Sequence, residues 1–361
     1  MGAAALANGA NGTNAPSIGI QVSVGSSHSS SQSSEDQTTQ RGSSVQAGGT
    51  ATFIATGNGA PGSGNVTIAG SDVSASDVAL IAKNQVNLLN TTNTDSTRSS
   101  NSSSSASVGV SFGTNGWGIS ASMQNAHGDG NSDAALQNNT HINASNSATI
   151  LSGGDTNIVG ASVNANQVVA NIGGNLNIAS VQDTTVSAAH QSSAGGGFSV
   201  STMGGASASF NAQKGHADGN YAGVNEQAGI QAGSGGFDIT VKGNTDLKGA
   251  VIGSTADASK NSLTTATLTY SDIQDHSHYS ASSGGFSAGG SAGPRQQAVG
   301  PASVSGSGGV TPMMFQNANG DESATTRSAV SAGTINVTDG ANQKQDAASL
   351  SRDTNNTNGT V

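Results

Sequence analysis

Cysteine is absent from the 361 residues, and aromatic residues (3%), charged residues (9%) and proline (5 residues) are scarce. Without cysteine the chain has no disulfide framework, no thiol nucleophile and no cysteine-ligated zinc. It also has too few large apolar side chains for a thick core, while its low charge and low proline content are unlike those of ordinary disordered chains. The remaining composition is rich in Gly, Ser, Asn, Thr and Ala with regularly spaced Val, Ile and Leu. It predicts a thin, elongated β structure.

Basic charge and long apolar runs are missing as well. The chain has 11 Lys and Arg against 21 Asp and Glu, a net charge of −10. We therefore expect no nucleic-acid partner, because counterion-release binding needs a basic face. We also expect no stable membrane insertion, because no run approaches the roughly 18 apolar residues of a membrane span. The stretch from Met1 to Ala7 lacks the basic start of a secretory signal, so the chain is expected to be either cytoplasmic or a piece of a larger protein; the repeats favour the second.

A repeat of about 89 residues organises the sequence. Four aligned glycines, at positions 19, 109, 197 and 285, are separated by 90, 88 and 88 residues. A second set, at positions 70, 160 and 249, is separated by 90 and 89, and the segments 127–131 and 216–220 are separated by 89. Three independent markers with one period indicate a true structural repeat.

Each unit has two parts. In the first, short apolar pairs such as Val66 and Ile68, then Val78 and Leu80, then Val86 and Leu88, alternate with Gly, Ser, Asn and Asp. This pattern predicts short strands separated by turns. Three short strands in about 20 residues are typical of a parallel β-solenoid, with about 12 coils if the pattern fills the chain.

The second part is a Ser-rich run leading into a β-hairpin. Val108 to Phe112 alternate up to Asn115-Gly116, and Trp117 to Met123 alternate away from it. Asn-Gly favours a two-residue hairpin turn, and Gly204-Gly205 takes the same place in the next unit. We expect the apolar face of the hairpin to pack on the solenoid flank. The alternative is an exposed recognition patch around Phe112 and Trp117.

The repeats divide the chain into four segments. Residues 1–16 are expected to be a flexible lead, and 17–293 to be the repeat region, with units starting near 17, 107, 196 and 284. Residues 294–322 hold three of the five prolines, which predicts a disordered Pro/Gly/Ser-rich insertion. Residues 323–361 are expected to form a terminal partial coil and a polar tail.

The order and period of these motifs resemble the haemagglutinin-repeat region of two-partner-secreted exoproteins, a group that includes filamentous haemagglutinin-type adhesins and contact-dependent growth inhibition effectors. The resemblance rests on Gly-Val-Ser-Phe-Gly at 109–113, the Ser-rich run 99–107, Gly-Asp-Gly at 128–130, Val-x-Ala-Gly-Gly at 45–49 and Leu-Ser-Arg-Asp-Thr at 350–354. It implies an all-β fold, a right-handed parallel β-helix with protruding or flanking hairpins. It also implies a secreted or cell-surface stalk for adhesion or toxin delivery. The implied partners are an outer-membrane transporter and a target-cell surface protein or glycan.

Two histidine–aspartate pairs have the residue types of metal ligands: His127 with Asp129, and His216 with Asp218. Each aspartate precedes a glycine, as in tight turns, and we interpret both pairs as turns. His276 and His278 would share one face of a strand, but no third ligand lies near them in the sequence.

A carbohydrate-active β-helix enzyme acting on acidic polysaccharide is the alternative function. Such enzymes need convergent carboxylates. The candidate acids are scattered, at most one to a coil: Asp72, Asp77, Asp95, Asp155 and Asp183. The glycine run 195–197 lacks the Lys-Ser/Thr of a phosphate loop. We assign no catalytic residue, no cofactor and no metal site, and predict a non-enzymatic module.

Overall fold

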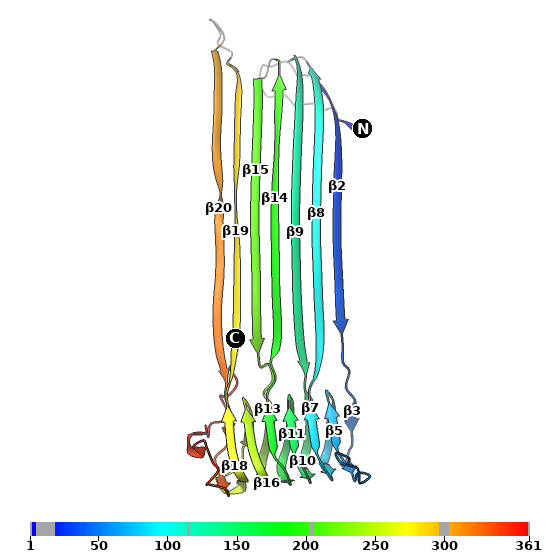
Figure 1. The fold of residues 1–361 in the computed structure, drawn as a ribbon, viewed down its shortest axis with the longest axis vertical. Helices are drawn as coiled ribbons and strands as arrows, with labels where there is room; N and C mark the ends of the chain where they lie inside the picture. The colour runs from blue at the N-terminus through cyan, green and yellow to red at the C-terminus, as the bar shows by residue number, and fades with distance from the viewer. Residues whose placement is uncertain (1, 5–18, 114–115, 203–204, 296–302, 360–361) are drawn as a thin grey trace.

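The computed structural model describes residues 2–4, 19–113, 116–202, 205–295 and 303–359, and these are almost entirely β. They form two sheets, with no α-helix among the described residues. One sheet is curled, mostly parallel and stacked in coils; the other is a long antiparallel blade that rises from it (Figure 1). The predicted all-β class is confirmed. The predicted lead, 1–16, lies outside the described residues except for Gly2–Ala4, which form strand β1.

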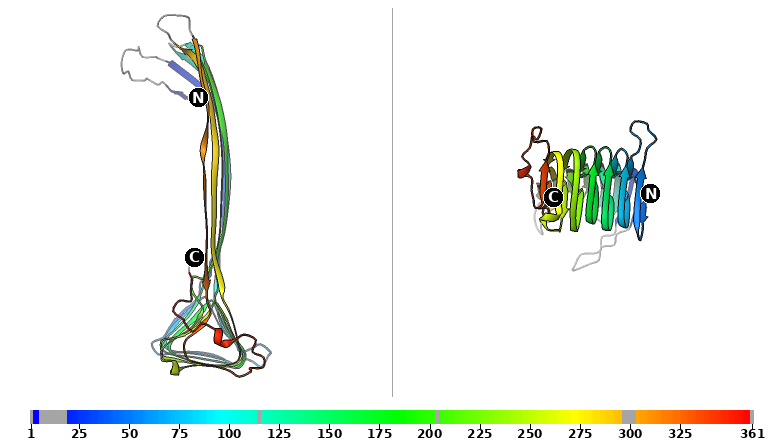
Figure 2. Two further views of the ribbon diagram at one scale, coloured as in Figure 1. Left: turned by 90° about the vertical axis from the view of Figure 1, so that its left-hand side faces the viewer. Right: turned by 90° about the horizontal axis from the view of Figure 1, so that it is seen from below.

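The parallel sheet contains the coils. Its strands are β3 (Ser44–Gln46), β4 (Thr50–Ala55), β5 (Val66–Ala69), β6 (Asp72–Ala82), β7 (Val86–Leu89), β10 (Thr140–Ser152), β11 (Thr156–Val159), β12 (Ala161–Ile172), β13 (Leu176–Ala179), β16 (Gly229–Lys248), β17 (Val251–Ser254), β18 (Asn261–Ser271), β21 (Ala329–Val330) and β22 (Thr334–Val337). Figure 2 shows the coils end-on as a triangular outline and, from below, as a stack.

The core of the stack consists of aligned apolar columns, one residue from each coil. One column follows the register through Val45, Val73, Ile142, Val163, Ile230, Ile252 and Val330. Parallel pairing in register puts identical positions of successive coils directly above one another, so small β-branched residues fill a narrow interior. The polar side chains align outside in the same way: Asn177 donates to Asn157 and Asn157 donates to Asn87, each at 2.8 Å.

The antiparallel blade is built from the hairpins. In spatial order its strands are β1, β2 (Gly19–Thr38), β8 (Thr91–Gly113), β9 (Gly116–Asn138), β14 (Asp183–Ser201), β15 (Gly205–Gly223), β19 (Ile273–Arg295) and β20 (Ser303–Thr326). A strand of about 20 residues is some 68 Å long at roughly 3.4 Å per residue. The longest dimension of the molecule is therefore the blade and not the stack (Figure 1).

The blade exists because the hairpin spacing matches the coil spacing. Two coils separate β8–β9 from the next hairpin, and two coils advance the stack by about 9.6 Å, which is also the width of two paired strands. Consecutive hairpins therefore meet edge to edge, β9 with β14 and β15 with β19. The 89-residue period therefore consists of two coils plus one hairpin. Val73 aligns with Ile142 on the next coil, and Ile142 aligns with Val163 on the coil after it, which is 90 residues after Val73.

Three sequence-based expectations are corrected here. The hairpins do not pack on the flank of the coils but pair with one another away from them. The stack has seven layers in the column described above, not about 12, since the hairpins take up much of the chain. Most of the insertion expected to be disordered, 294–322, is strand: 294–295 end β19, and 303–322 belong to β20, paired along β19. Residues 296–302 lie outside the described part.

The C-terminal segment closes one end of the stack. Gln343 accepts from the Leu268 N–H at 2.8 Å and donates to the Leu268 carbonyl at 2.7 Å. Gln345 does the same with Tyr270, at 2.8 and 3.0 Å. Two side-chain amides thus imitate a further strand at the exposed edge of β18, and Leu350, 2% exposed, covers the core. Unpaired strand edges attract other strands, so this segment caps the parallel sheet.

Candidate interaction surface

The two faces of the blade differ in chemistry because side chains alternate along each strand and directly paired residues share a face. Near the tip, one face is apolar, and we call it the apolar tip face. Its members are Ile20, Val22, Val24, Val108, Val110, Phe112, Trp117, Ile119, Met123, Phe198, Val200, Phe210, Phe286 and Val310. The blade is one sheet thick, so nothing within the described chain covers them.

Exposure values decide between the two readings of the hairpin aromatics. Phe112 is 59% exposed and Trp117, its cross-strand partner, is 52% exposed. The prediction that they pack on the solenoid is wrong, and the exposed-patch alternative describes them. Of the predicted turn residues, Asn115 and Gly204 lie outside the described residues. Gly116 and Gly205 begin the returning strands with φ of 92° and 88°, which glycine adopts without steric cost.

The opposite face of the tip is made of serine and glycine. One row across the blade reads Ser23, Gly109, Ser120, Ser199, Ser207, Ser291 and Ser307. Some of these hydroxyls hydrogen-bond across strands, as Ser199 does with Ser207 at 2.7 Å. The tip is therefore amphipathic, with a polar face of small residues behind an apolar one.

Closer to the coils, the apolar face gives way to a His–Asp row. It comprises Asp129, His190, His216, Asp218, His278 and Asp321, on strands β9 to β20. His190 lies 3.4 Å from Asp129, His216 lies 2.8 Å from Asp218, and His278 lies 2.6 Å from Asp321. The rings of His190 and His216 stack at 4.4 Å. The His190–Asp129 and His278–Asp321 pairs join neighbouring strands, whereas His216 pairs with Asp218 two residues along the same strand. Each histidine therefore has a carboxylate beside it.

The histidine–aspartate motifs do not occupy turns, as their glycines suggested. His127 and Asp129 lie within β9, and His216 and Asp218 lie within β15. Among the described residues, no group of three or more His, Asp or Glu has the geometry to hold a metal ion. His276 lies on β19 two residues before His278, as expected for one strand face.

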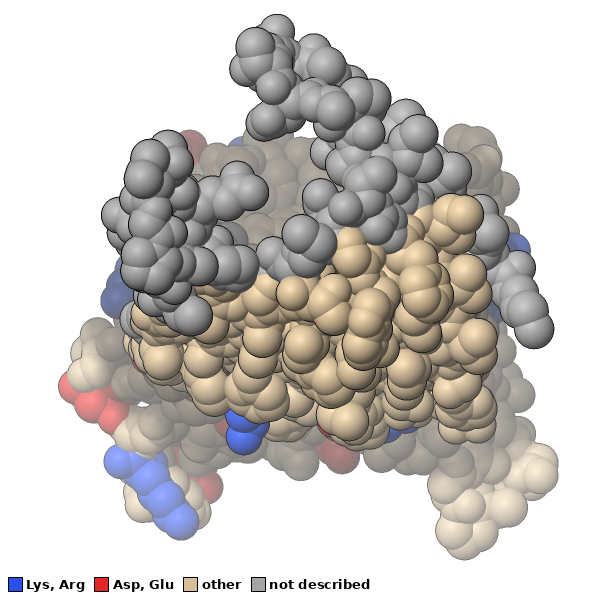
Figure 3. All heavy atoms as spheres, turned by 90° about the horizontal axis from the view of Figure 1, so that it is seen from above, with Lys and Arg blue, Asp and Glu red and all other residues tan. Residues whose placement is uncertain are grey.

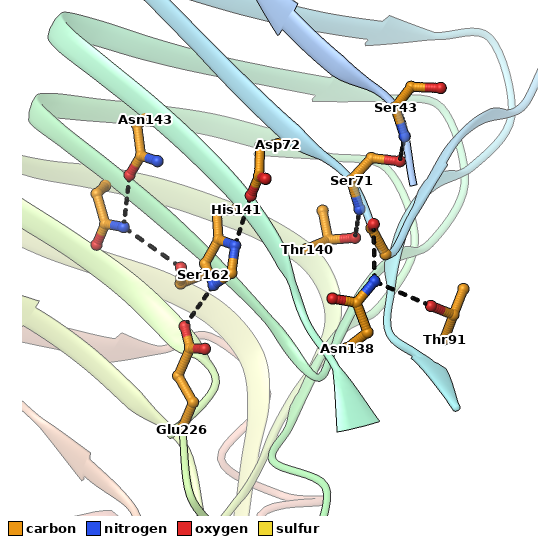
Figure 4. A network of polar contacts seen from close by, with 12 residues as sticks. Ser43, Ser71, Asp72, Thr91, Asn138, Thr140, His141, Asn143, Ser162 and Glu226 are labelled. Atoms are coloured by element: carbon orange, nitrogen blue, oxygen red, sulfur yellow. Dashed lines mark hydrogen bonds and ion pairs between the residues drawn. The ribbon is translucent and has the colours of Figure 1, made fainter. Parts of the chain in front are cut away.

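The site that sequence reasoning missed is a clamp at His141, which joins two neighbouring coils to the segment that links β15 of the blade to β16 (Figure 4). Its Nδ1 lies 2.7 Å from Asp72 on the preceding coil, and its Nε2 lies 2.8 Å from Glu226 in the segment between β15 and β16. Burial lowers the pKa of His141, but the hydrogen bonds and charges of Asp72 and Glu226 outweigh it and raise the pKa overall. The clamp is thus strongest when His141 is protonated.

The candidate carboxylates serve separate structural bonds. Asp77 accepts from Ser147 at 2.6 Å and from Asn146 at 2.7 Å, and these bonds lower its pKa. Asp155 accepts from the Asn175 N–H at 2.7 Å, and Asp183 from the Gln137 N–H at 2.6 Å. Asp95, on β8, accepts from Thr97 at 3.3 Å. These bonds tie turns, coils and strands together.

A buried carboxylate at the base of the hairpins is a second residue without a sequence signal. Asp275 is 0% exposed and accepts from the Val224 N–H at 3.0 Å, from Gln182 at 2.9 Å and from Thr326 at 2.7 Å. Three donors compensate for the loss of water around a buried charge. Asp275 therefore fixes where β15, β19 and β20 meet the coils.

The fold and these surfaces define a β-repeat protein whose coils carry regularly spaced, mutually paired hairpins. Of the described residues, none lies in a helix long and apolar enough to cross a membrane. No solved structure matches the chain.

Comparison with known proteins identifies the repeat. The family described as Hemagglutinin repeat matches residues 24–194. The chain is 76% identical over all its 361 residues to a tRNA nuclease CdiA of Burkholderia pseudomallei, of which it covers 28%. It is 40% identical over 349 residues to a deoxyribonuclease CdiA of Yersinia pseudotuberculosis, which is 95% of the chain and 32% of that protein. It is 38% identical over 355 residues to a toxin CdiA of Escherichia coli, 95% of the chain and 11% of that protein.

The chain belongs to the haemagglutinin-repeat family and is a repeat region of the CdiA type. The resemblance inferred from the sequence motifs is confirmed. The chain spans about a third or less of the length of these relatives.

Proposed function

We propose that this region is a non-catalytic stalk of a secreted, cell-surface exoprotein and serves cell contact, adhesion or toxin delivery. The observation that carries the proposal is the uninterrupted stacking of coils through one apolar column, with a hairpin at every second coil. Such stacking can be extended by further repeats without changing the interface between neighbours. We further propose that the coils wind as a right-handed parallel β-helix.

The relatives support a non-catalytic role. One is called a tRNA nuclease and another a deoxyribonuclease, yet this same region aligns with both along 95% or more of its length. A shared region does not explain a difference in substrate, so we place the nuclease activity outside it. The separately bonded carboxylates also lack the paired arrangement on which polysaccharide hydrolysis depends.

The proposed partners are an outer-membrane transporter of the two-partner type for the longer protein, and a protein or glycan on the target cell. Because this region has no cysteine, a thiol introduced into it reports on its location once the labelling of the unsubstituted longer protein has been subtracted. Ser122→Cys places a thiol on the exposed serine face, whereas Ile158→Cys places one in the core, where Ile158 is 0% exposed.

The longer protein carrying either variant is produced with and without its transporter, and intact cells are treated with a membrane-impermeant maleimide. We expect labelling of Ser122→Cys that requires the transporter, and no labelling of Ile158→Cys. Labelling only after lysis would contradict the surface proposal. Separately, the purified chain is expected to turn over neither tRNA, DNA nor acidic polysaccharide; turnover that a single Asp→Asn change abolishes would show an enzyme.

A further inference from the structure

The apolar tip face is too large to be an ordinary surface feature. It extends across seven strands, from β2 to β20, and over four to five rows of side chains. At about 4.8 Å between strands and roughly 6.8 Å between rows, it measures on the order of 900 Å². Exposed apolar patches beyond a few hundred Å² mark interaction sites, and about 800 Å² per partner is what a stable protein–protein interface buries.

The charge distribution favours a protein partner of the same chemistry over a lipid surface. No Asp, Glu, Lys or Arg occurs in 19–27, 105–124, 195–211, 285–294 or 303–315, the segments that form the tip of the blade, and the one charged residue beside them is Arg295, the last residue of β19. The described part of the tip nearest to the viewer in Figure 3 is accordingly uncharged. Attraction to anionic headgroups needs a cluster of Lys and Arg, which a single arginine at the end of β19 does not provide, while two uncharged faces meet without repulsion.

The shape of the blade also suits a second copy. The patch is one face of an antiparallel sheet, and two such faces pack about 10 Å apart with their strands nearly aligned. A two-fold axis brings the same face of each copy into contact, so a self-complementary apolar surface is sufficient. The His–Asp row, closer to the coils, limits the dry contact to the tip.

We propose that two copies of this chain associate through their apolar tip faces and form a β-sandwich in which Phe112, Trp117 and Ile119 become buried. This goes beyond the proposed stalk function and does not depend on it. A sandwich supplies the second layer that a single sheet with an apolar face lacks.

The test measures self-association of the full chain by sedimentation velocity from about 1 to about 100 µM. Trp117 is the only tryptophan, so its emission should shift to the red as the dimer dissociates on dilution. The disrupting variant combines Ile119→Thr, Phe198→Thr and Val200→Thr, which keep β-compatible residues on β9 and β14. It should raise the dimer dissociation constant about a hundredfold.

The matched control carries Ser120→Thr, Ser122→Thr and Ser199→Thr, on the same two strands but on the serine face. We expect it to dimerise like the parent, with the same far-ultraviolet β signal in all three proteins. A parent that stays monomeric over the whole range, or a dimer that the apolar-face variant leaves intact, overturns the proposal. So does a monomeric parent that binds phosphatidylcholine vesicles, which would make lipid the occupant. If the variant fails to fold, the proposal is still tested by the parent protein, whose Trp117 emission should shift to the red on dilution.

Discussion

Replacing Gln343 by alanine should open the capped edge of the coil stack without unfolding it. The side-chain amide of Gln343 both accepts from and donates to the backbone of Leu268, at 2.8 and 2.7 Å. Each such bond contributes about 1 kcal/mol net, so losing the two bonds to Leu268 costs about 2 kcal/mol, apart from the bond of 2.6 Å that Gln343 also donates to the Gln345 carbonyl within the cap. That corresponds to a roughly thirtyfold larger equilibrium constant for local opening at this edge.

Hydrogen exchange of the Leu268 amide measures this opening directly. Leu268 is 0% exposed, so its amide exchanges only when the cap is displaced. Gln343→Glu keeps the acceptor but sets a carboxylate against the Leu268 carbonyl, and we expect it to lose at least as much protection as Gln343→Ala. Gln124→Ala, on the blade, is the control and should leave Leu268 unchanged. Unchanged exchange at Leu268 in Gln343→Ala would refute the capping role.

Three further predictions concern the core, a corner and the clamp. Ile158→Ala removes a fully buried side chain aligned between Leu88 and Ile178, and should lower the free energy of unfolding by about 3 kcal/mol in urea titrations. Gly160→Ala should cost at least about 1–2 kcal/mol, because φ is +53° and a Cβ would lie 2.7 Å from Asn90 and Val181, whereas Gly48→Ala, with open space around it, should be nearly neutral in the same titration. His141→Asn should lower the melting temperature more at about pH 5.5 than at about pH 8. Because the pKa of His141 is raised in the folded state, its stabilising effect is complete below the unfolded-state pKa and is lost as the pH rises through the folded-state pKa. An equal decrease in melting temperature at both pH values would contradict the clamp.

Much of the local structure follows from residues close in sequence. The alternation of Val66 and Ile68 with polar residues predicts strands, and the period predicts stacking, because identical side chains align when coils pair in register. The glycines at 70, 160 and 249, which served as a repeat marker, all have φ near +53°. The spacing of these glycines therefore predicted a corner that every repeat shares. The family, too, was recognisable from motif order.

Only the tertiary structure decided the blade and the sites on it. Alternation tells that Phe112 and Trp117 share a face, but not whether that face meets the coils or water. The outcome depends on the match between the rise of two coils and the width of one hairpin, a distance that no single segment contains. The same holds for residues whose partners are far along the chain. His141 is 69 residues from Asp72 and 85 from Glu226, and Asp275 is 51 from Thr326. Residues 303–322 gave no strand signal and yet form β20, because β19 offers them an open edge to pair with.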